Sequence, residues 1–89
     1  MNRAWKPDES AELVRRLGKS PEELGNTGGR TECPDIWELD NGDVAVVGHD
    51  LTQAYSERLP PGLRIGAGER LVVIPRSTIV AAKADLPDA

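Results

Sequence analysis

The fold is decided by residues 35–49, with the sequence Asp-Ile-Trp-Glu-Leu-Asp-Asn-Gly-Asp-Val-Ala-Val-Val-Gly-His. Two runs of β-favouring residues flank Asn41-Gly42, the dipeptide best suited to a two-residue turn in which both central residues have positive φ. We therefore expect a β-hairpin with strands over 35–39 and 44–47. Neither this stretch nor the rest of the chain carries a recognisable catalytic motif.

Apolar residues fall on both faces of this hairpin. Successive strand residues point to opposite faces, so Trp37 and Leu39 share one face and Ile36 lies on the other. The chain has no Phe, so we expect Trp37 to be the largest contributor to a core of Leu, Val, Ile and Ala. Helices should cover one face of the hairpin, and the N-terminal segment, a second copy or a partner should cover the other.

The C-terminal half predicts two helices and one strand. Leu51, Tyr55 and Leu59 fall on one face of a helix over 51–59 that Asp50 or Thr52 caps. The apolar run 71–74 is typical of a central strand, and Pro75 ends it. Ser77 then caps a helix over 78–85. The order strand-strand-helix-strand-helix predicts an α+β fold with a small antiparallel three-stranded sheet.

The N-terminal third predicts a helical arm. Leu13, Val14 and Leu17 recur at helical spacing over 8–17, and Gly18 suits the end of that helix. Ser20 and Glu23 have the spacing of a capping box, followed by a Gly-rich linker. We therefore divide the chain into an N-terminal helical arm with its linker, 1–32, and a compact α+β domain, 33–89.

Composition limits the classes of function. Eighty-nine residues form one small domain, and such marginal domains often gain stability by self-association. The net charge of −4 disfavours direct nucleic-acid binding, which needs a basic face, and is compatible with a basic protein partner. The N-terminus lacks the apolar stretch of a signal peptide, and no window reaches the length of a membrane span. The expected location is therefore the cytoplasm.

Three residues come closest to reaction chemistry. His49 and Asp50 are adjacent in a strand and point to opposite faces, so a polar strand end followed by a helix cap explains them more simply than an acid–base pair. Cys33 is the only cysteine, which excludes an intrachain disulfide and leaves a small residue at the strand entrance, or a redox or interchain role. One Cys and one His do not complete a zinc site.

The remaining polar motifs favour binding or solvation over catalysis. Arg64, Arg70 and Arg76 are close enough in sequence to form an anion-binding spot, although solvated charges explain them more simply. The Gly-rich segments lack the Gly-Lys-Ser/Thr of a phosphate loop. We expect no cofactor, no metal and no catalytic residue. The candidate partner-binding residues are Trp5, Leu13, Leu17, Trp37 and Val47.

A pattern is formed by Gly28 and Gly29 before Cys33, the turn residue Gly42, and the segments 44–46, 71–74 and 77–83. In these positions the chain resembles the BldB-like family of small actinobacterial proteins, which are often encoded beside helix-turn-helix regulators. The resemblance covers about 33–85, while the helix at 51–59, the last helix without aromatics and the N-terminal arm depart from the family pattern. It implies a regulatory, protein-binding role and carries over no catalytic residue.

Three functional hypotheses follow. The first is a non-enzymatic protein-interaction module that regulates a partner such as a helix-turn-helix transcription factor. The second is a small antitoxin or immunity protein, whose acidic surface suits a basic target. The third is a minor ligand-binding or enzyme subunit that uses His49, Asp50 and Arg64 or Arg76.

Overall fold

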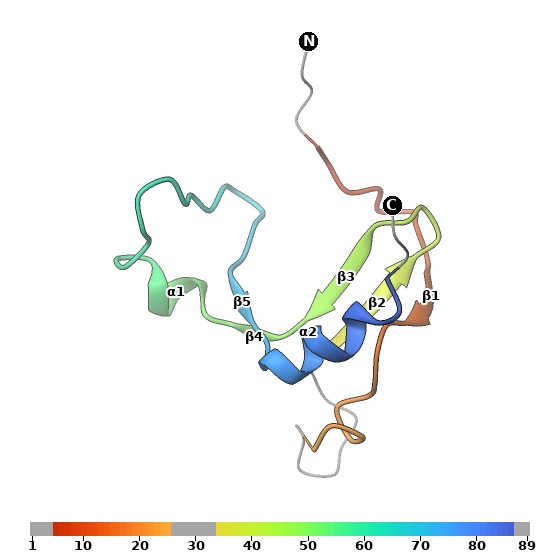
Figure 1. Cartoon of the computed structure of the whole chain (residues 1–89). Coiled ribbons are helices and arrows are strands. Elements are labelled where there is room, and N and C mark those ends of the chain that lie inside the picture. Colours follow the sequence, from red (N-terminus) through yellow and green to blue (C-terminus); the bar gives the residue numbers. More distant parts are fainter. Residues whose placement is uncertain (1–4, 26–33, 87–89) are drawn as a thin grey trace.

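The computed structural model describes residues 5–25 and 34–86. Its elements, in chain order, are β1 (Leu13–Arg16), β2 (Asp35–Leu39), β3 (Val44–Val47), β4 (His49–Asp50), α1 (Thr52–Tyr55), β5 (Val72–Val73) and α2 (Arg76–Lys83). An antiparallel sheet of order β1-β2-β3 carries α2, and β4 pairs with β5 in a second, two-stranded sheet (Figure 1). The predicted α+β class is confirmed.

The hairpin is present, but its turn differs from the prediction. The Leu39 N–H donates to the Asp43 carbonyl at 2.8 Å, and the Gly42 N–H donates to the Leu39 carbonyl at 3.0 Å. Gly42 has φ +90°, and no described non-glycine residue has positive φ. The loop therefore has three residues and one left-handed position. The Asn41 side-chain oxygen accepts the Asp43 N–H at 2.9 Å, which favours this longer loop.

The N-terminal segment is a strand where we expected a helix over 8–17. β1 pairs antiparallel with β2, and the Leu17 N–H continues the ladder by donating to the Ile36 carbonyl at 2.8 Å. Hydrogen bonding to the edge of β2 outweighs a helical spacing that only three apolar residues supported. The predicted arm over 1–32 is therefore not a separate unit within the described residues, because its strand completes the sheet.

β5 is shorter and more peripheral than the central strand expected over 71–74. β1 occupies the place beside β2, and β5 pairs with β4 alone. Val72 and Val73 remain exposed. Gly48 separates β3 from β4, and a Cβ at this position would lie 2.7 Å from the Val73 carbonyl oxygen. The missing side chain lets β5 pass close to Gly48 at the end of β3.

The two predicted helices are present with shifted bounds. α1 occupies four residues inside the range 51–59, and the Asp50 carboxylate accepts the Thr52 N–H at 3.0 Å beside its start. α2 begins before the predicted range 78–85, with Pro75 at its N-cap in place of Ser77. The fixed φ of proline is compatible with this early start.

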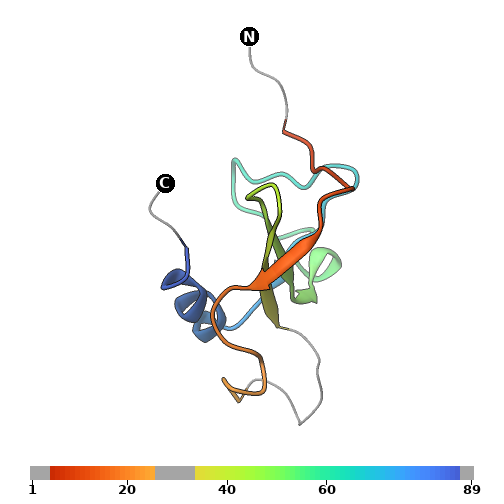
Figure 2. The same ribbon diagram turned by 90° about the vertical axis from the view of Figure 1, so that its right-hand side faces the viewer.

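The core lies between α2 and one face of the three-stranded sheet. Leu17, Ile36 and Ala82 are its buried apolar residues, and the half-buried Ile74 packs against them. Figure 2 shows α2 along one side of the sheet. Gly18 permits this approach, because a Cβ there would lie 2.6 Å from the Ala82 nitrogen. Trp37, which we expected in the core, points to the other face and is only half-buried.

Candidate functional site

The strongest candidate site is the face of the sheet opposite α2, which we call the open face. Residues directly opposed in antiparallel strands share a face. The register pairs Trp37 with Arg16 on one side and with Ala45 on the other, and it pairs Asp35 with Val47 and Leu13 with Leu39. The open face therefore consists of Leu13, Arg16, Asp35, Trp37, Leu39, Ala45 and Val47.

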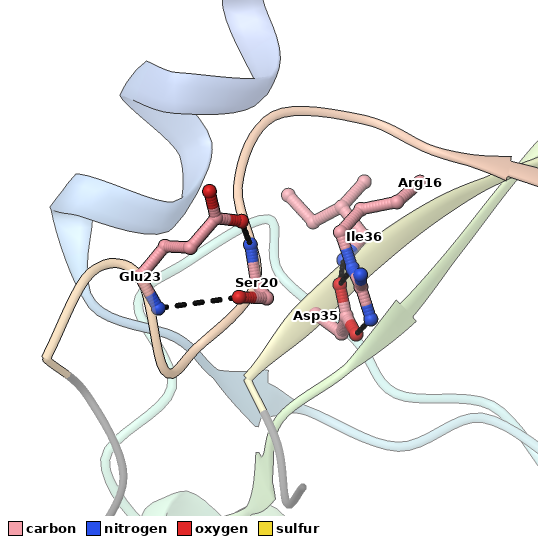
Figure 3. Close-up of polar contacts among 5 residues, drawn as sticks. All are labelled: Arg16, Ser20, Glu23, Asp35 and Ile36. Carbon is pink, nitrogen blue, oxygen red and sulfur yellow. Dashed lines mark hydrogen bonds and ion pairs between the residues drawn. The ribbon is translucent and has the colours of Figure 1, made fainter.

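A tight polar cluster occupies the middle of the open face. The Arg16 Nε and Nη2 atoms each donate to one oxygen of Asp35, both at 2.9 Å, in a bidentate ion pair (Figure 3). The Arg16 guanidinium also lies 5.1 Å from the centre of the Trp37 ring. Two parallel hydrogen bonds and a cation–π contact hold the guanidinium in a fixed plane.

The protonation of this cluster follows from its contacts. Burial works to raise the pKa of the Asp35 carboxyl, but hydrogen bonds from Arg16 and Trp37 and the positive charge of Arg16 outweigh it, so the pKa lies below its usual value. The hydrogen bond to Asp35 in turn raises the pKa of Arg16. Both groups are therefore charged at neutral pH, and each neutralises the other. The centre of the open face is polar but carries little net charge.

Apolar side chains surround this cluster. Leu13 is 60% exposed and Val47 is 53% exposed, while Leu39 and Ala45 are half-buried. In an antiparallel sheet, a face that carries apolar side chains is usually packed against another element, while the face exposed to solvent is polar. Trp and Arg are enriched in protein–protein interfaces, so a face that carries both beside exposed apolar side chains is suited to contact with another protein surface.

The structure brings three of the five candidate partner-binding residues onto the open face: Leu13, Trp37 and Val47. Trp5 lies before β1 and is 71% exposed. Leu17 is only 1% exposed and belongs to the core. It therefore leaves the candidate set, because the strand turns it towards α2.

A capping box fixes the chain just after β1. The Ser20 N–H donates to the Glu23 carboxylate at 3.0 Å, and the Glu23 N–H donates to the Ser20 hydroxyl oxygen at 3.2 Å (Figure 3). These bonds to Ser20 lower the pKa of Glu23. The predicted reciprocal pattern is confirmed, and the segment that follows Ser20 forms a turn.

His49 lines a separate apolar pocket of about 420 Å³ together with Leu51, Val73, Ile74 and Pro75. The carboxylate of Asp50 accepts the Thr52 N–H, which lowers the pKa of Asp50. One Asp50 oxygen also lies 4.0 Å from Arg70 Nε. His49 is thus the only ionisable side chain lining this pocket, and Asp50 is committed to other partners.

The three arginines do not form one anion site. Arg64 and Arg70 line a second pocket of about 290 Å³ with Leu63, Ile65, Glu69 and Leu71. Arg76 belongs to the first turn of α2. Glu69 accepts the Gly66 N–H at 2.7 Å and brings a carboxylate into the same pocket. Cys33 lies outside the described residues.

Among the residues that the structure describes, no three His, Cys, Asp or Glu side chains gather as they would around a metal ion. Neither described helix has the length and apolar character needed to cross a membrane. Comparisons with protein-family models, curated proteins and solved structures gave no match for this chain. Its function must therefore be argued from the open face itself.

Sequence reasoning missed the ion pair of this site, Arg16 and Asp35. A helix over 8–17 would place Arg16 away from any strand, so its partner could not be assigned. Residues 14–17, Val-Arg-Arg-Leu, do not alternate between apolar and polar, so this segment gave no sign of a strand. The separation of Trp37 from Ile36 onto different faces was predicted correctly.

Proposed function

We propose that this protein is a non-enzymatic protein-interaction module that binds its partner through the open face. The observation that carries the proposal is the difference between the two faces of one sheet. α2 packs against Leu17 and Ile36 on one face, while Leu13 and Val47 on the Trp37 face remain more than half exposed. Contiguous exposed apolar side chains on one face commonly mark a binding site.

The centre of the open face also fits a binding role. Trp and Arg are enriched among the residues that dominate binding energy in protein interfaces. Here Arg16 and Trp37 are already held against each other before any partner arrives. A preorganised contact loses less side-chain entropy on binding than a mobile one. We infer a regulatory partner, such as a helix-turn-helix transcription factor, in the cytoplasm.

Affinity capture from the native host tests this proposal with a matched pair of variants. Leu13→Lys places a charge on the open face, and Val80→Lys places the same charge on the exposed side of α2, where Val80 is 59% exposed. We expect wild type and Val80→Lys to recover the same partner in similar amounts, and Leu13→Lys to recover at least tenfold less of it. Equal recovery by both variants would contradict binding through the open face.

The net charge of −4 favours a second candidate, an antitoxin or immunity protein that neutralises a basic target. This candidate also binds a protein, but its partner is harmful when left alone. Deletion of the neighbouring gene distinguishes the two proposals. An antitoxin becomes dispensable when its toxin is absent, whereas loss of a regulator still gives a phenotype.

A further inference from the structure

The outer edge of β3 offers a row of unused backbone hydrogen-bonding groups. The Leu39 N–H donates to the Asp43 carbonyl, which assigns the pairs Trp37–Ala45 and Asp35–Val47 to the bonded positions of the ladder. The N–H and C=O groups of Val44 and Val46 therefore point away from β2. Among the described residues, no strand pairs with this edge.

The two edges of the sheet are protected differently. β1 carries Arg15 and Arg16, and its register with β2 shifts between Leu13 and Arg15. Charges and irregularities of this kind discourage the addition of another strand. β3 has the sequence Val-Ala-Val-Val and pairs regularly along its whole length. It has no charge, no proline and no register shift.

We propose that two copies of this chain pair antiparallel through their β3 strands, about a two-fold axis at Val46. A two-fold axis perpendicular to the sheet keeps each face continuous, so only residues of one face can oppose each other. The resulting pairs are Val46 with Val46, Val44 with Gly48, Ala45 with Val47, and Asp43 with His49 of the other copy. Val44 and Val46 then use their free backbone groups.

Side-chain complementarity favours this register, because an imidazole can donate a hydrogen bond to a carboxylate. Asp43 and His49 lie three residues on either side of Val46, so the axis brings an acidic and an imidazole side chain together at both ends of the interface. The neighbouring register, centred on Ala45, places Asp43 opposite the apolar Val47 of the other copy, so no complementary side chains meet there. The sequence around β3 is thus self-complementary in only one of these two arrangements.

Pairing with a second copy also compensates for the small apolar core of the single chain. Leu17, Ile36 and Ala82 are the buried apolar residues among those described, and small domains of this kind are commonly stabilised by association. The pairing joins two three-stranded sheets into one of six strands and leaves the open face uncovered in both copies. This dimer is therefore independent of the partner proposed above, and either proposal can fail without the other.

Sedimentation equilibrium of the full chain tests the dimer with variants of the edge and of its charges. Val46→Pro removes the central N–H donor without removing a bond to β2, and we expect a monomer with an unchanged circular dichroism spectrum. His49→Asp opposes two carboxylates at each end, and we expect the dimer to weaken about tenfold. Asp43→Lys combined with His49→Asp places opposite charges at each end and should recover the affinity to within about threefold of wild type.

Gln53→Asp is the matched control for His49→Asp, because it adds one negative charge at an exposed position of α1 and should leave the affinity unchanged. Amide exchange gives a second readout, since the Val44 and Val46 N–H groups should exchange slowly only at concentrations where the dimer forms. Wild type that remains monomeric at about 100 µM, or a dimer that His49→Asp leaves intact, overturns the proposal. The charge variants decide the outcome even if Val46→Pro does not fold.

Discussion

Substitution of Gly18 by alanine should weaken the attachment of α2 to the sheet. Gly18 has φ +82°, and a Cβ there would lie 2.6 Å from the Ala82 nitrogen and 2.8 Å from the Ala81 carbonyl carbon. These are backbone atoms, so α2 itself must move. The left-handed conformation costs a residue with a Cβ about 1–2 kcal/mol, and overpacking adds about 1–3 kcal/mol.

Gly42→Ala is the control that isolates the contact with α2. Gly42 has a similar φ of +90°, but no heavy atom lies within 4 Å of a Cβ built there. This variant should lose only the conformational part, about 1–2 kcal/mol. Gly18→Ala should therefore be less stable than Gly42→Ala by about 1–3 kcal/mol. That difference is a large fraction of the roughly 5–13 kcal/mol expected for a domain of this length.

Urea unfolding followed by circular dichroism measures this difference. With a slope of about 1–1.5 kcal/mol per molar urea, the midpoint of Gly18→Ala should fall about 0.7–3 M below that of Gly42→Ala. Equal midpoints for the two variants would refute the close packing of Gly18 against α2. They would also remove the reason for assigning the Ile36 face to the core and the Trp37 face to the surface.

Three further substitutions test the sheet and its ion pair. Leu17→Ala should lower the free energy of unfolding by about 2–5 kcal/mol because Leu17 is buried, whereas Leu13→Ala should change it by less than about 1 kcal/mol; equal small effects in thermal melts would favour a detached arm. Asp35→Asn should remove about 0.5–1 kcal/mol at neutral pH. The folded-state pKa of Asp35 lies below its ordinary value, so the unfolded chain binds more protons than the folded chain as the pH falls. The stabilisation by Asp35 is therefore present above the unfolded pKa of about 3.9 and is lost as the pH falls through the lower folded-state pKa. Wild type and Asp35→Asn should thus converge in stability as the pH falls below about 5, and a constant difference would contradict this role of Asp35.

The hairpin, the later helices and the faces of β2 could be predicted because their causes are local. Asn41-Gly42 limits where the chain reverses, and alternation separates Trp37 from Ile36. Strand β1 could not be predicted in this way, because its hydrogen bonds are made to β2, about twenty residues away in sequence. The displacement of β5 from the main sheet has the same origin, since it depends on which strand reaches the edge of β2.

Only part of the open face could be predicted from the sequence. Apolar residues on both sides of the hairpin indicated that one face would be covered from elsewhere, and Trp37 and Val47 were assigned to the candidate set. The Arg16–Asp35 pair depends on the register of β1 against β2, which no local pattern encodes. Leu17 entered the candidate set because a helix was expected, and a strand turns its side chain to the core.

Photo-crosslinking in the native host tests most directly whether the open face is where a partner binds. A photoreactive amino acid replaces Leu13 on the open face in one strain and Val80 on α2 in another, two side chains of similar exposure. Irradiation at position 13 should give one dominant adduct with a different protein, and position 80 should give little of it. Equal adducts at both positions, or the adduct at position 80 alone, would contradict binding through the open face.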